Sequence, residues 1–321
     1  MISAKSTGHS FKAVLALFPL ACVPRGFAEK NEPAALATSV VSGATSADVR
    51  TEHVDRNGVR YAYRRYGKES AVPLVLLQHF RGSMDNWDPA LIDALGKERT
   101  VVIFDNEGVS GSSGVTPDSF AAMAEGAAQF VRALGYEKVD ILGFSIGGAV
   151  AQELAVAHPA LVRRLILAGT APQGGEGMNA RDPKIIALAT KAVPEYDDLL
   201  TLFFEPTDAS QKAGRAFVER LKRRTLDLDV PSSAQTMRAQ AKARNDWGAT
   251  IDPGHSRLKR ITQPVLVANG SHDIMMFTVN SVTMFQNIAN AQLILYPDSG
   301  HGFLFQYPEL FAMHVSAFLN G

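Results

Sequence analysis

The chain has 321 residues, of which 46% are hydrophobic and 20% charged, so it is long enough to bury a large core in one or two domains. Its 32 Lys and Arg residues match its 32 Asp and Glu residues, which gives a formal net charge of 0. A chain without a basic excess has no general attraction for a phosphate backbone, so we expect no nucleic-acid partner.

The N-terminus has the pattern of an export signal. Lys5 and Lys12 precede an apolar run at residues 13–23. At about 11 residues this run is too short to span a bilayer, but it fits the hydrophobic part of a signal peptide. Small residues at positions 26 and 28 suit a signal peptidase, so we predict cleavage before Glu29 and export to the periplasm or the medium. A buried core helix is the alternative, which prolines at positions 19 and 24 disfavour.

Loss of residues 1–28 would remove three basic residues and no acids, which moves the formal charge from 0 to 0 − 3 = −3. It would also remove Cys22, the single cysteine, so the mature chain would form no disulfide. Residues 20–22 loosely resemble a lipoprotein cleavage box, and a lipid anchor at Cys22 is therefore a minor alternative. Residues 29–50 are rich in Ala, Ser and Thr without periodicity, and we predict a flexible leader there.

A β-hairpin is predicted at the start of the domain, which we expect at residues 51–321. Two strand-like runs within residues 51–67 are joined by Asn57-Gly58, a pair that tolerates the positive φ angles of a tight turn. The continuous apolar run at 73–80 is typical of a strand buried on both faces. The following text predicts, in chain order, a helix at 87–97, a strand at 100–105, a helix from Pro117 to Leu134, a strand at 139–143, a helix to His158 and a strand at 161–169.

The alternation of strands and helices is interrupted at residues 173–260. This stretch is helical and charged in pattern, without a convincing strand, and the strand pattern resumes at 264–270 and 291–297 around a helix at 279–288. A last helix is predicted from Pro308. Strands that alternate with helices of this length indicate right-handed βαβ units and a mostly parallel sheet. We therefore predict one α/β domain that carries a helical cap insertion.

The pentapeptide Gly143-Phe144-Ser145-Ile146-Gly147 lies where a predicted strand meets a predicted helix. A G-x-S-x-G turn at such a junction is so tight that only glycines fit beside the serine, and it lifts the hydroxyl above the sheet edge. The N-terminus of the following helix favours developing negative charge. The sequence thus predicts Ser145 as a nucleophile; the alternative is a glycine-rich turn whose serine only caps the helix.

At this point the chain resembles the α/β-hydrolase superfamily, from Thr51 to the C-terminus. It is most similar to small esterases and to cofactor-free haloperoxidase-like hydrolases. The similarity is carried by LLQHFRGSMDNWDP, VVIFDNEGVSGSSG, VDILGFSIGGAVAQELA, LVRRLILAGTAP, VLVANGSHD and LYPDSGHGFLFQYP. The resemblance implies an eight-stranded sheet and a catalytic triad in the chain order Ser, acid, His.

His301 follows the last predicted strand, with a glycine on each side, and is the expected general base. Asp273 follows the penultimate strand and would orient the imidazole by a hydrogen bond to its far nitrogen. The alternatives are a surface histidine and an aspartate that caps a helix. His272, Asp105 and Asp298 compete with Asp273, although Asp105 resembles the structural aspartate of the superfamily.

Two backbone N–H groups are expected to form the oxyanion hole. Ile146, directly after the nucleophile, provides one, and the resemblance assigns the other to Phe80, after His79. Most relatives have glycine in place of Phe80, so this ring is expected to narrow the mouth of the pocket. No further ligands are spaced around His79, which disfavours a metal role for it.

Three side chains are candidates for substrate binding: Arg81, Trp87 and Trp247. A solvated loop cation and core aromatic residues are the ordinary alternatives. The run LLTLFF at 199–204 suits either the roof of a substrate cavity or the face by which the insertion packs on the sheet.

The predicted activity is acyl transfer: hydrolysis of a carboxylic ester or lactone through an acyl-serine intermediate. A perhydrolase or cofactor-free haloperoxidase would use the same triad, and a C–C bond hydrolase would use Arg81 to bind a carboxylate. A non-catalytic receptor is the distant alternative. No P-loop, G-x-G-x-x-G or H-E-x-x-H motif is present, so we expect no cofactor and no metal. The expected partner is a small ester-like molecule, and we expect no stable membrane span in the mature chain.

Overall fold

Eight strands form one sheet in the computed structural model, which describes residues 45–179, 181–192 and 195–321. The predicted signal peptide and most of the predicted leader lie outside these residues. The strand order is β1-β2-β4-β3-β5-β6-β7-β8. β1 and β2 pair antiparallel with their neighbours, and all the other pairs are parallel. The predicted fold class, a mostly parallel eight-stranded α/β-hydrolase sheet, is confirmed.

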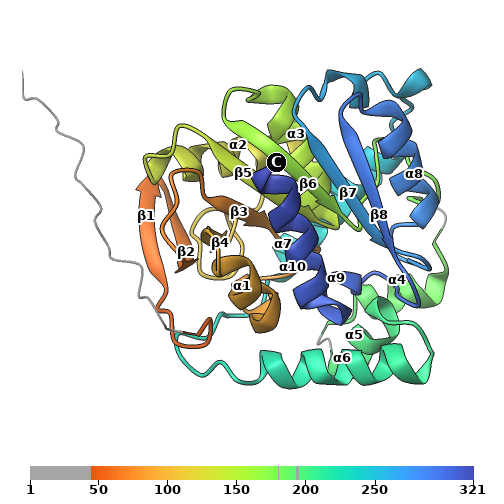
Figure 1. Ribbon diagram of the computed structural model, residues 1–321, viewed down its shortest axis with the longest axis horizontal. Coiled ribbons are helices and arrows are strands. Elements are labelled where there is room, and N and C mark those ends of the chain that lie inside the picture. The colour runs from red at the N-terminus through yellow and green to blue at the C-terminus, as the bar shows by residue number, and fades with distance from the viewer. Residues whose placement is uncertain (1–44, 180, 193–194) are drawn as a thin grey trace, which may run out of the picture. The chain divides into compact units, whose positions relative to one another are not determined.

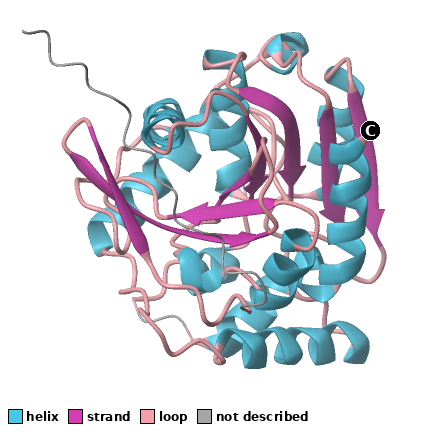
Figure 2. Cartoon of the chain, turned by 60° about the vertical axis from the view of Figure 1, so that its left-hand side comes forward, coloured by secondary structure: helices cyan, strands magenta, loops and turns pink. Residues whose placement is uncertain are grey.

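The strands closely follow the hydrophobic runs. They are β1 (Glu52–Arg56), β2 (Val59–Gly67), β3 (Leu74–Leu77), β4 (Thr100–Phe104), β5 (Val139–Phe144), β6 (Val162–Ala168), β7 (Val265–Gly270) and β8 (Ala291–Tyr296). The hairpin turn is formed by Asn57 and Gly58, with φ angles of 50° and 81°, as the tight-turn prediction requires. Figure 2 shows the twist of the sheet, whose strands at one end run at a steep angle to those at the other.

Helices cover both faces of the sheet (Figures 1 and 2). Side chains of α2 (Phe120–Ala133), α3 (Ile146–Ala157) and α8 (Thr278–Asn287) belong to one hydrophobic core. Side chains of α1 (Pro89–Gly96) and α10 (Pro308–Asn320) belong to the other, together with the short α9 (Phe303–Gln306), which the sequence did not predict. Successive residues of β3 alternate between the two cores, because side chains of a strand point to opposite faces.

One predicted helix begins later than expected. α2 was expected from Pro117, but it begins at Phe120, because the Ser119 hydroxyl accepts a hydrogen bond from the Ala122 N–H and caps the helix.

The described residues of the segment between β6 and β7 form helices joined by loops, with no strand among them. The segment contains α4 (Pro183–Ala189), α5 (Tyr196–Phe203), α6 (Asp208–Leu221) and α7 (Ala234–Ala249), followed by two short 3₁₀ helices, Pro253–His255 and Leu258–Arg260. A bidentate ion pair joins Arg220 of α6 to Asp88, at 2.7 and 2.6 Å. Asp88 caps the N-terminus of α1, so this pair holds the insertion against α1.

The last residues of the predicted leader contact the domain. The Ser46 N–H donates to Asp93 at 2.8 Å, and Arg224 of the insertion donates to the carbonyl oxygens of Ser46, Ala47 and Val49. Residues 46–49 therefore belong to the folded unit, which begins a few residues before position 51.

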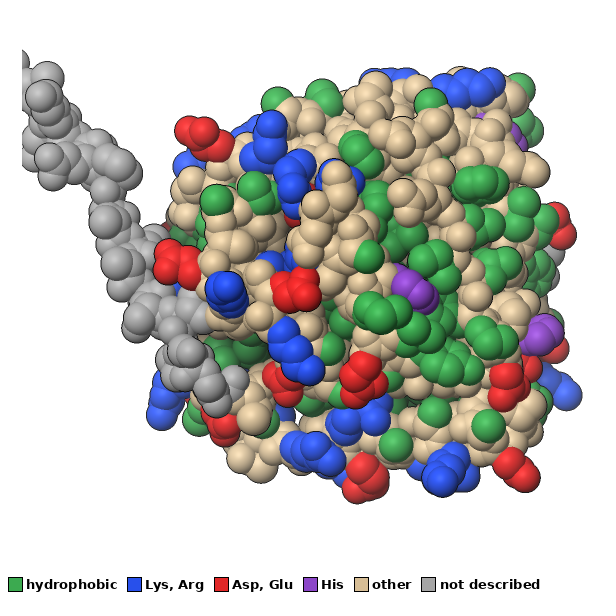
Figure 3. Space-filling model, in the orientation of Figure 1, with side chains coloured by type: hydrophobic (Ala, Val, Ile, Leu, Met, Phe, Trp, Pro, Cys, Tyr) green, Lys and Arg blue, Asp and Glu red, His purple; other side chains and the backbone are tan. Residues whose placement is uncertain are grey.

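Charged side chains of both signs lie side by side on the face drawn in Figure 3, mainly along its lower edge, where α6 lies. Hydrophobic side chains are more frequent over β8 and α10, whose exposed members include Leu295, Leu310 and Met313. No helix within the described ranges is long and apolar enough to cross a bilayer.

Candidate active site

Ser145 lies on a strained turn between β5 and α3. Its φ and ψ are 58° and −122°, and its N–H donates to the carbonyl of Ala168 on the neighbouring strand at 3.0 Å. A Cβ at Gly147 would lie 2.2 Å from the Leu77 carbonyl oxygen, and a Cβ at Gly143 would lie 2.4 Å from that of Gly147. The chain therefore needs glycine at both flanking positions to present the serine above the sheet edge.

His301 and Asp273 form a buried hydrogen-bonded pair. His301 Nδ1 lies 2.7 Å from Asp273 Oδ2, and the side chains are 1% and 0% exposed. Since a carboxylate oxygen only accepts, Nδ1 is the donor in this pair, and in the neutral ring Nε2 then has a lone pair. The other carboxylate oxygen accepts from the N–H groups of Met275 and Met276 at 2.7 and 2.9 Å, which fixes the orientation of Asp273.

The fold brings Ser145 to the same sheet edge as this pair. The ring of Phe144 lies 4.8 Å, centroid to centroid, from that of His301. The carbonyl oxygen of Ala168 accepts from the Ser145 N–H, and Gly169 is the next residue. A Cβ at Gly169 would lie 3.3 Å from His301 Nδ1. Among the hydrogen bonds of the described residues, none joins Ser145 Oγ to His301. Such contacts are often long in substrate-free enzymes and tighten when substrate binds.

Ser145 lines a small cavity whose other walls come largely from the helical insertion. Phe80 and Ile146 line it as well. Ile146 is the first residue of α3, so its N–H has no partner within the helix and points out of a positive helix end. The remaining lining residues are Arg181, Ile185, Ile186, Ala189, Thr190, Ala241, Arg244, Met275 and Met276.

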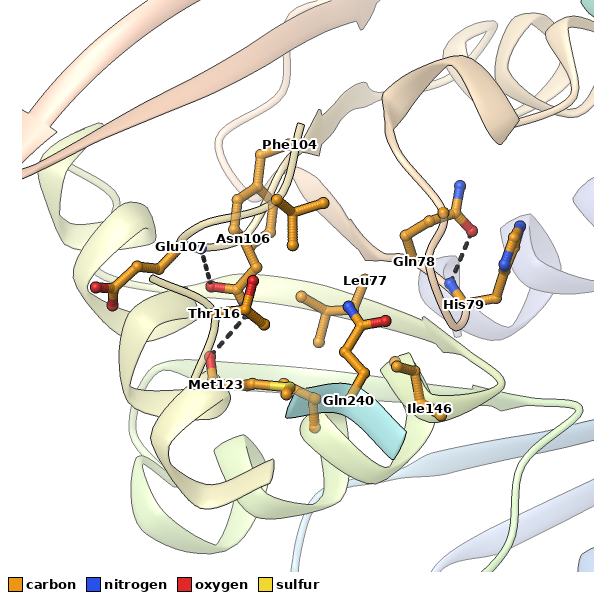
Figure 4. A pocket seen from close by; sticks show the side chains of 14 residues that line it. Leu77, Gln78, His79, Phe104, Asn106, Glu107, Thr116, Met123, Ile146 and Gln240 are labelled. Atoms are coloured by element: carbon orange, nitrogen blue, oxygen red, sulfur yellow. Dashed lines mark hydrogen bonds between the residues drawn. The ribbon is translucent and has the colours of Figure 1, made fainter. Parts of the chain in front are cut away.

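Side chains hold the loop that carries Phe80. Gln78 accepts from the His79 N–H at 2.9 Å, and the His79 ring donates from Nδ1 to the Phe80 carbonyl oxygen at 2.9 Å. Gln240 of α7 accepts from the Arg81 N–H at 2.7 Å. Figure 4 shows Gln78, His79 and Gln240 around a second cavity, which Ile146 also lines. Burial lowers the pKa of His79 to about 4, so this ring is neutral at pH 7.

None of the three candidates for substrate binding lines the Ser145 cavity. Arg81 has a φ of 63° and donates from its guanidinium to the carbonyl oxygens of Lys191 and Ala192, so it ties its loop to the insertion. Trp87 is buried against Phe144 and Phe305 in one core. Trp247 is buried against Phe120 in the other and donates to the carbonyl oxygen of Ala171 at 3.3 Å.

The competing acids have other partners. Asp105 accepts from the N–H groups of Met84 and Gly111, a structural role that agrees with the predicted resemblance. Asp298 accepts from the hydroxyl of Thr207 on the insertion, and the His272 ring bonds to the adjacent Ser271 hydroxyl.

The run at 199–204 packs against the histidine loop. The Phe203 ring lies 5.2 Å from that of His301 and 5.4 Å from that of His79, and the Phe203 carbonyl oxygen accepts from the Gly302 N–H at 2.7 Å. Neither described cavity includes this run in its lining, which favours the packing interpretation over the roof of the cavity.

Sequence reasoning missed two cationic residues of the cavity, Arg181 and Arg244. Burial, and then the nearby positive charge of Arg244, lower the pKa of Arg181 to about 10, while Asp273 opposes the shift. Neither arginine belongs to a motif, and only the folding of the insertion over the sheet brings them to Ser145. In the part of the chain that the structure describes, no cluster of three metal-ligating side chains occurs.

The similarities to known proteins agree with this geometry. The profile of the alpha/beta hydrolase fold family matches residues 72–308. An alpha/beta hydrolase fold protein from Chitinophaga pinensis is 42% identical, with a TM-score of 0.82 over 87% of this chain and 100% of that one.

Two curated relatives have named activities. A poly(3-hydroxyalkanoate) depolymerase from Ectopseudomonas oleovorans is 30% identical over 84% of this chain and 92% of its own length. A pimeloyl-[acyl-carrier protein] methyl ester esterase from Nitrosomonas europaea is 27% identical over 74% and 92%, respectively. By its sheet, its serine turn and these similarities, the chain belongs to the α/β-hydrolase fold family.

Proposed function

We propose that this chain is a serine hydrolase that cleaves a carboxylic ester or lactone through an acyl-Ser145 intermediate. The observation that carries the proposal is the buried 2.7 Å hydrogen bond between His301 Nδ1 and Asp273, which leaves Nε2 as a base beside the strained serine turn. The named activity of the Nitrosomonas relative, a methyl ester esterase, supports ester chemistry.

Each proposed step uses a group of the site. Ser145 Oγ attacks the acyl carbon as its proton moves to His301 Nε2, and the imidazolium is stabilised by Asp273. The N–H groups of Phe80 and Ile146 donate to the oxyanion of the tetrahedral intermediate. When this intermediate collapses, the alcohol leaves with the proton from Nε2. Water, deprotonated by the same nitrogen, then releases the acid and restores Ser145.

The direct test is Ser145→Ala, assayed with a short-chain 4-nitrophenyl ester. We expect loss of turnover and of fluorophosphonate labelling, because no other group takes the place of the nucleophile. Ser256→Ala, an exposed serine outside the cavity, is the matched control and should keep full activity. Retained hydrolysis in Ser145→Ala would reject the proposal. Faster formation of peracetic acid from acetate and hydrogen peroxide than ester hydrolysis would indicate a perhydrolase instead.

We also propose that the protein is exported, on the strength of the charged and apolar pattern of residues 5–28. Sequencing of the N-terminus of the protein expressed with its full leader should find Glu29 as the first residue. A mature chain that still begins with Met1 would contradict export by this signal.

A further inference from the structure

The cavity beside Ser145 contains two positive charges and no negative one. Arg181 and Arg244 are its charged lining residues, and the lining includes neither Asp nor Glu. Both arginines come from the helical insertion, whereas Ser145 comes from the sheet. Apart from Ser145 and Thr190, the other side chains of the lining are apolar. The cavity therefore suits an apolar group that ends in an anion.

Neither guanidinium has a carboxylate partner among the described residues. Arg181 Nε is buried without a hydrogen-bond acceptor, and Nη2 contacts only the thioether sulfur of Met276, at 3.3 Å. Arg244 contacts the neutral side-chain oxygen of Asn245 on its own helix. Shielding a guanidinium from water without an acidic partner is unfavourable, because the lost hydration is not replaced.

Three other shielded arginines of the described chain are paired with acids. Arg64 contacts Asp85 and Asp229, Arg224 contacts Asp85, and Arg220 contacts Asp88. Arg181 and Arg244 differ from these because none of the described residues supplies them an acid partner, and they line the same cavity as Ser145.

We propose, on the basis of the proposed ester hydrolysis, that Arg181 and Arg244 bind a carboxylate carried by the substrate, so that the preferred substrate is a monoester of a dicarboxylic acid or a related acyl compound with a second, ionised carboxyl group. A planar guanidinium fork matches a carboxylate. A phosphate group presents similar oxygens with a larger negative charge, and the experiment below includes it.

The test uses two substrates that differ only by methylation of the distal carboxyl group, which removes its charge: 4-nitrophenyl hydrogen glutarate and its methyl ester, 4-nitrophenyl methyl glutarate. Release of 4-nitrophenolate reports cleavage of the same activated ester in both. We expect wild-type kcat/KM to favour the acid at least tenfold. Arg181→Met and Arg244→Met should each reduce this preference at least tenfold, chiefly through KM. Arg238→Met, an exposed residue of α7 outside the cavity, is the matched control and should leave the preference unchanged.

Binding provides a readout that does not need turnover. Glutarate should raise the melting temperature of the wild type and of Arg238→Met, and this shift should be lost in Arg181→Met. A melting shift without hydrolysis of either ester would reject the proposed function and support the carboxylate site. Hydrolysis with no preference for the acid would support the proposed function and reject the carboxylate site.

Two further outcomes would overturn the inference. If both arginine variants lower kcat equally for the two esters and keep the preference, the arginines act on Asp273 and not on substrate. If inorganic phosphate raises the melting temperature and glutarate does not, the site takes phosphate groups and not carboxylates.

Discussion

Replacement of Asp273 by Asn tests the orientation of the histidine most sharply. Asp273 Oδ1 accepts from two backbone N–H groups, those of Met275 and Met276, at 2.7 and 2.9 Å. An asparagine keeps these contacts only if its carbonyl oxygen takes the place of Oδ1. Its NH₂ group then faces His301 Nδ1, where Oδ2 accepts at 2.7 Å in the wild type.

The consequence is a change of tautomer. With a donor opposite, Nδ1 must accept, so the proton moves to Nε2 and that nitrogen loses the lone pair needed to take the serine proton. We expect kcat to fall about 10⁴-fold, the size seen when a triad aspartate is replaced by Asn. This loss corresponds to about 5 kcal/mol of transition-state stabilisation. KM should change much less, because the cavity lining is untouched.

The assay compares kcat for a 4-nitrophenyl ester in wild type, Asp273→Asn and the control Asp298→Asn, with thermal melting to confirm folding. Asp298 lies three residues before His301 but bonds to Thr207, and its φ of 45° suits asparagine. Asp298→Asn should therefore keep activity within a few-fold of wild type. A folded Asp273→Asn protein within tenfold of wild type, or a larger loss in Asp298→Asn, would refute the reasoning.

Three further predictions concern the surroundings of the site. Arg220→Met leaves the fully buried Asp88 carboxylate unpaired and should lower the free energy of unfolding by about 3–5 kcal/mol in urea titrations; a loss below about 1 kcal/mol would contradict the role of the pair. His79, with its native pKa of about 4 against about 6.5 when unfolded, binds a proton only in the unfolded state between these pH values. Acidification from pH 6.5 to 4 should therefore destabilise wild type relative to His79→Asn by up to roughly 3 kcal/mol, and parallel stability curves for the two proteins would argue against this titration. Phe80→Ala keeps the backbone N–H and widens the cavity, so the preferred acyl chain should lengthen while kcat for an acetate ester stays within about tenfold; an unchanged chain-length profile would exclude Phe80 from the acyl pocket.

Much of the fold follows from local sequence. The Asn57-Gly58 turn, the buried runs of β3 and β5 and the Gly-x-Ser-x-Gly turn all depend on residues adjacent in the chain, so their periodicity and φ requirements can be read directly. The start of α2 was placed too early because proline at 117 and serine at 119 both suit a helix start. The hydrogen bond from the Ala122 N–H decided between them.

The roles of single polar and aromatic side chains required the tertiary structure. Trp87 and Trp247 are of a residue type common in pockets, yet they pack against rings far away in the sequence and belong to the hydrophobic core. Arg81 was a candidate for substrate binding, but it instead donates to the carbonyl oxygens of Lys191 and Ala192 and so holds the insertion. The contacts of Arg81 join positions that are more than a hundred residues apart in the sequence, so no local pattern encodes them.

By itself the sequence determined the sheet, the serine turn and the order in which Ser145, Asp273 and His301 occur. Only the folded insertion decided that Arg181 and Arg244 line the cavity without an acid partner. The physical reason is that strand and turn propensities act over a few residues. The partner of a buried charge is chosen by whichever side chains the whole fold brings within a few ångströms of it.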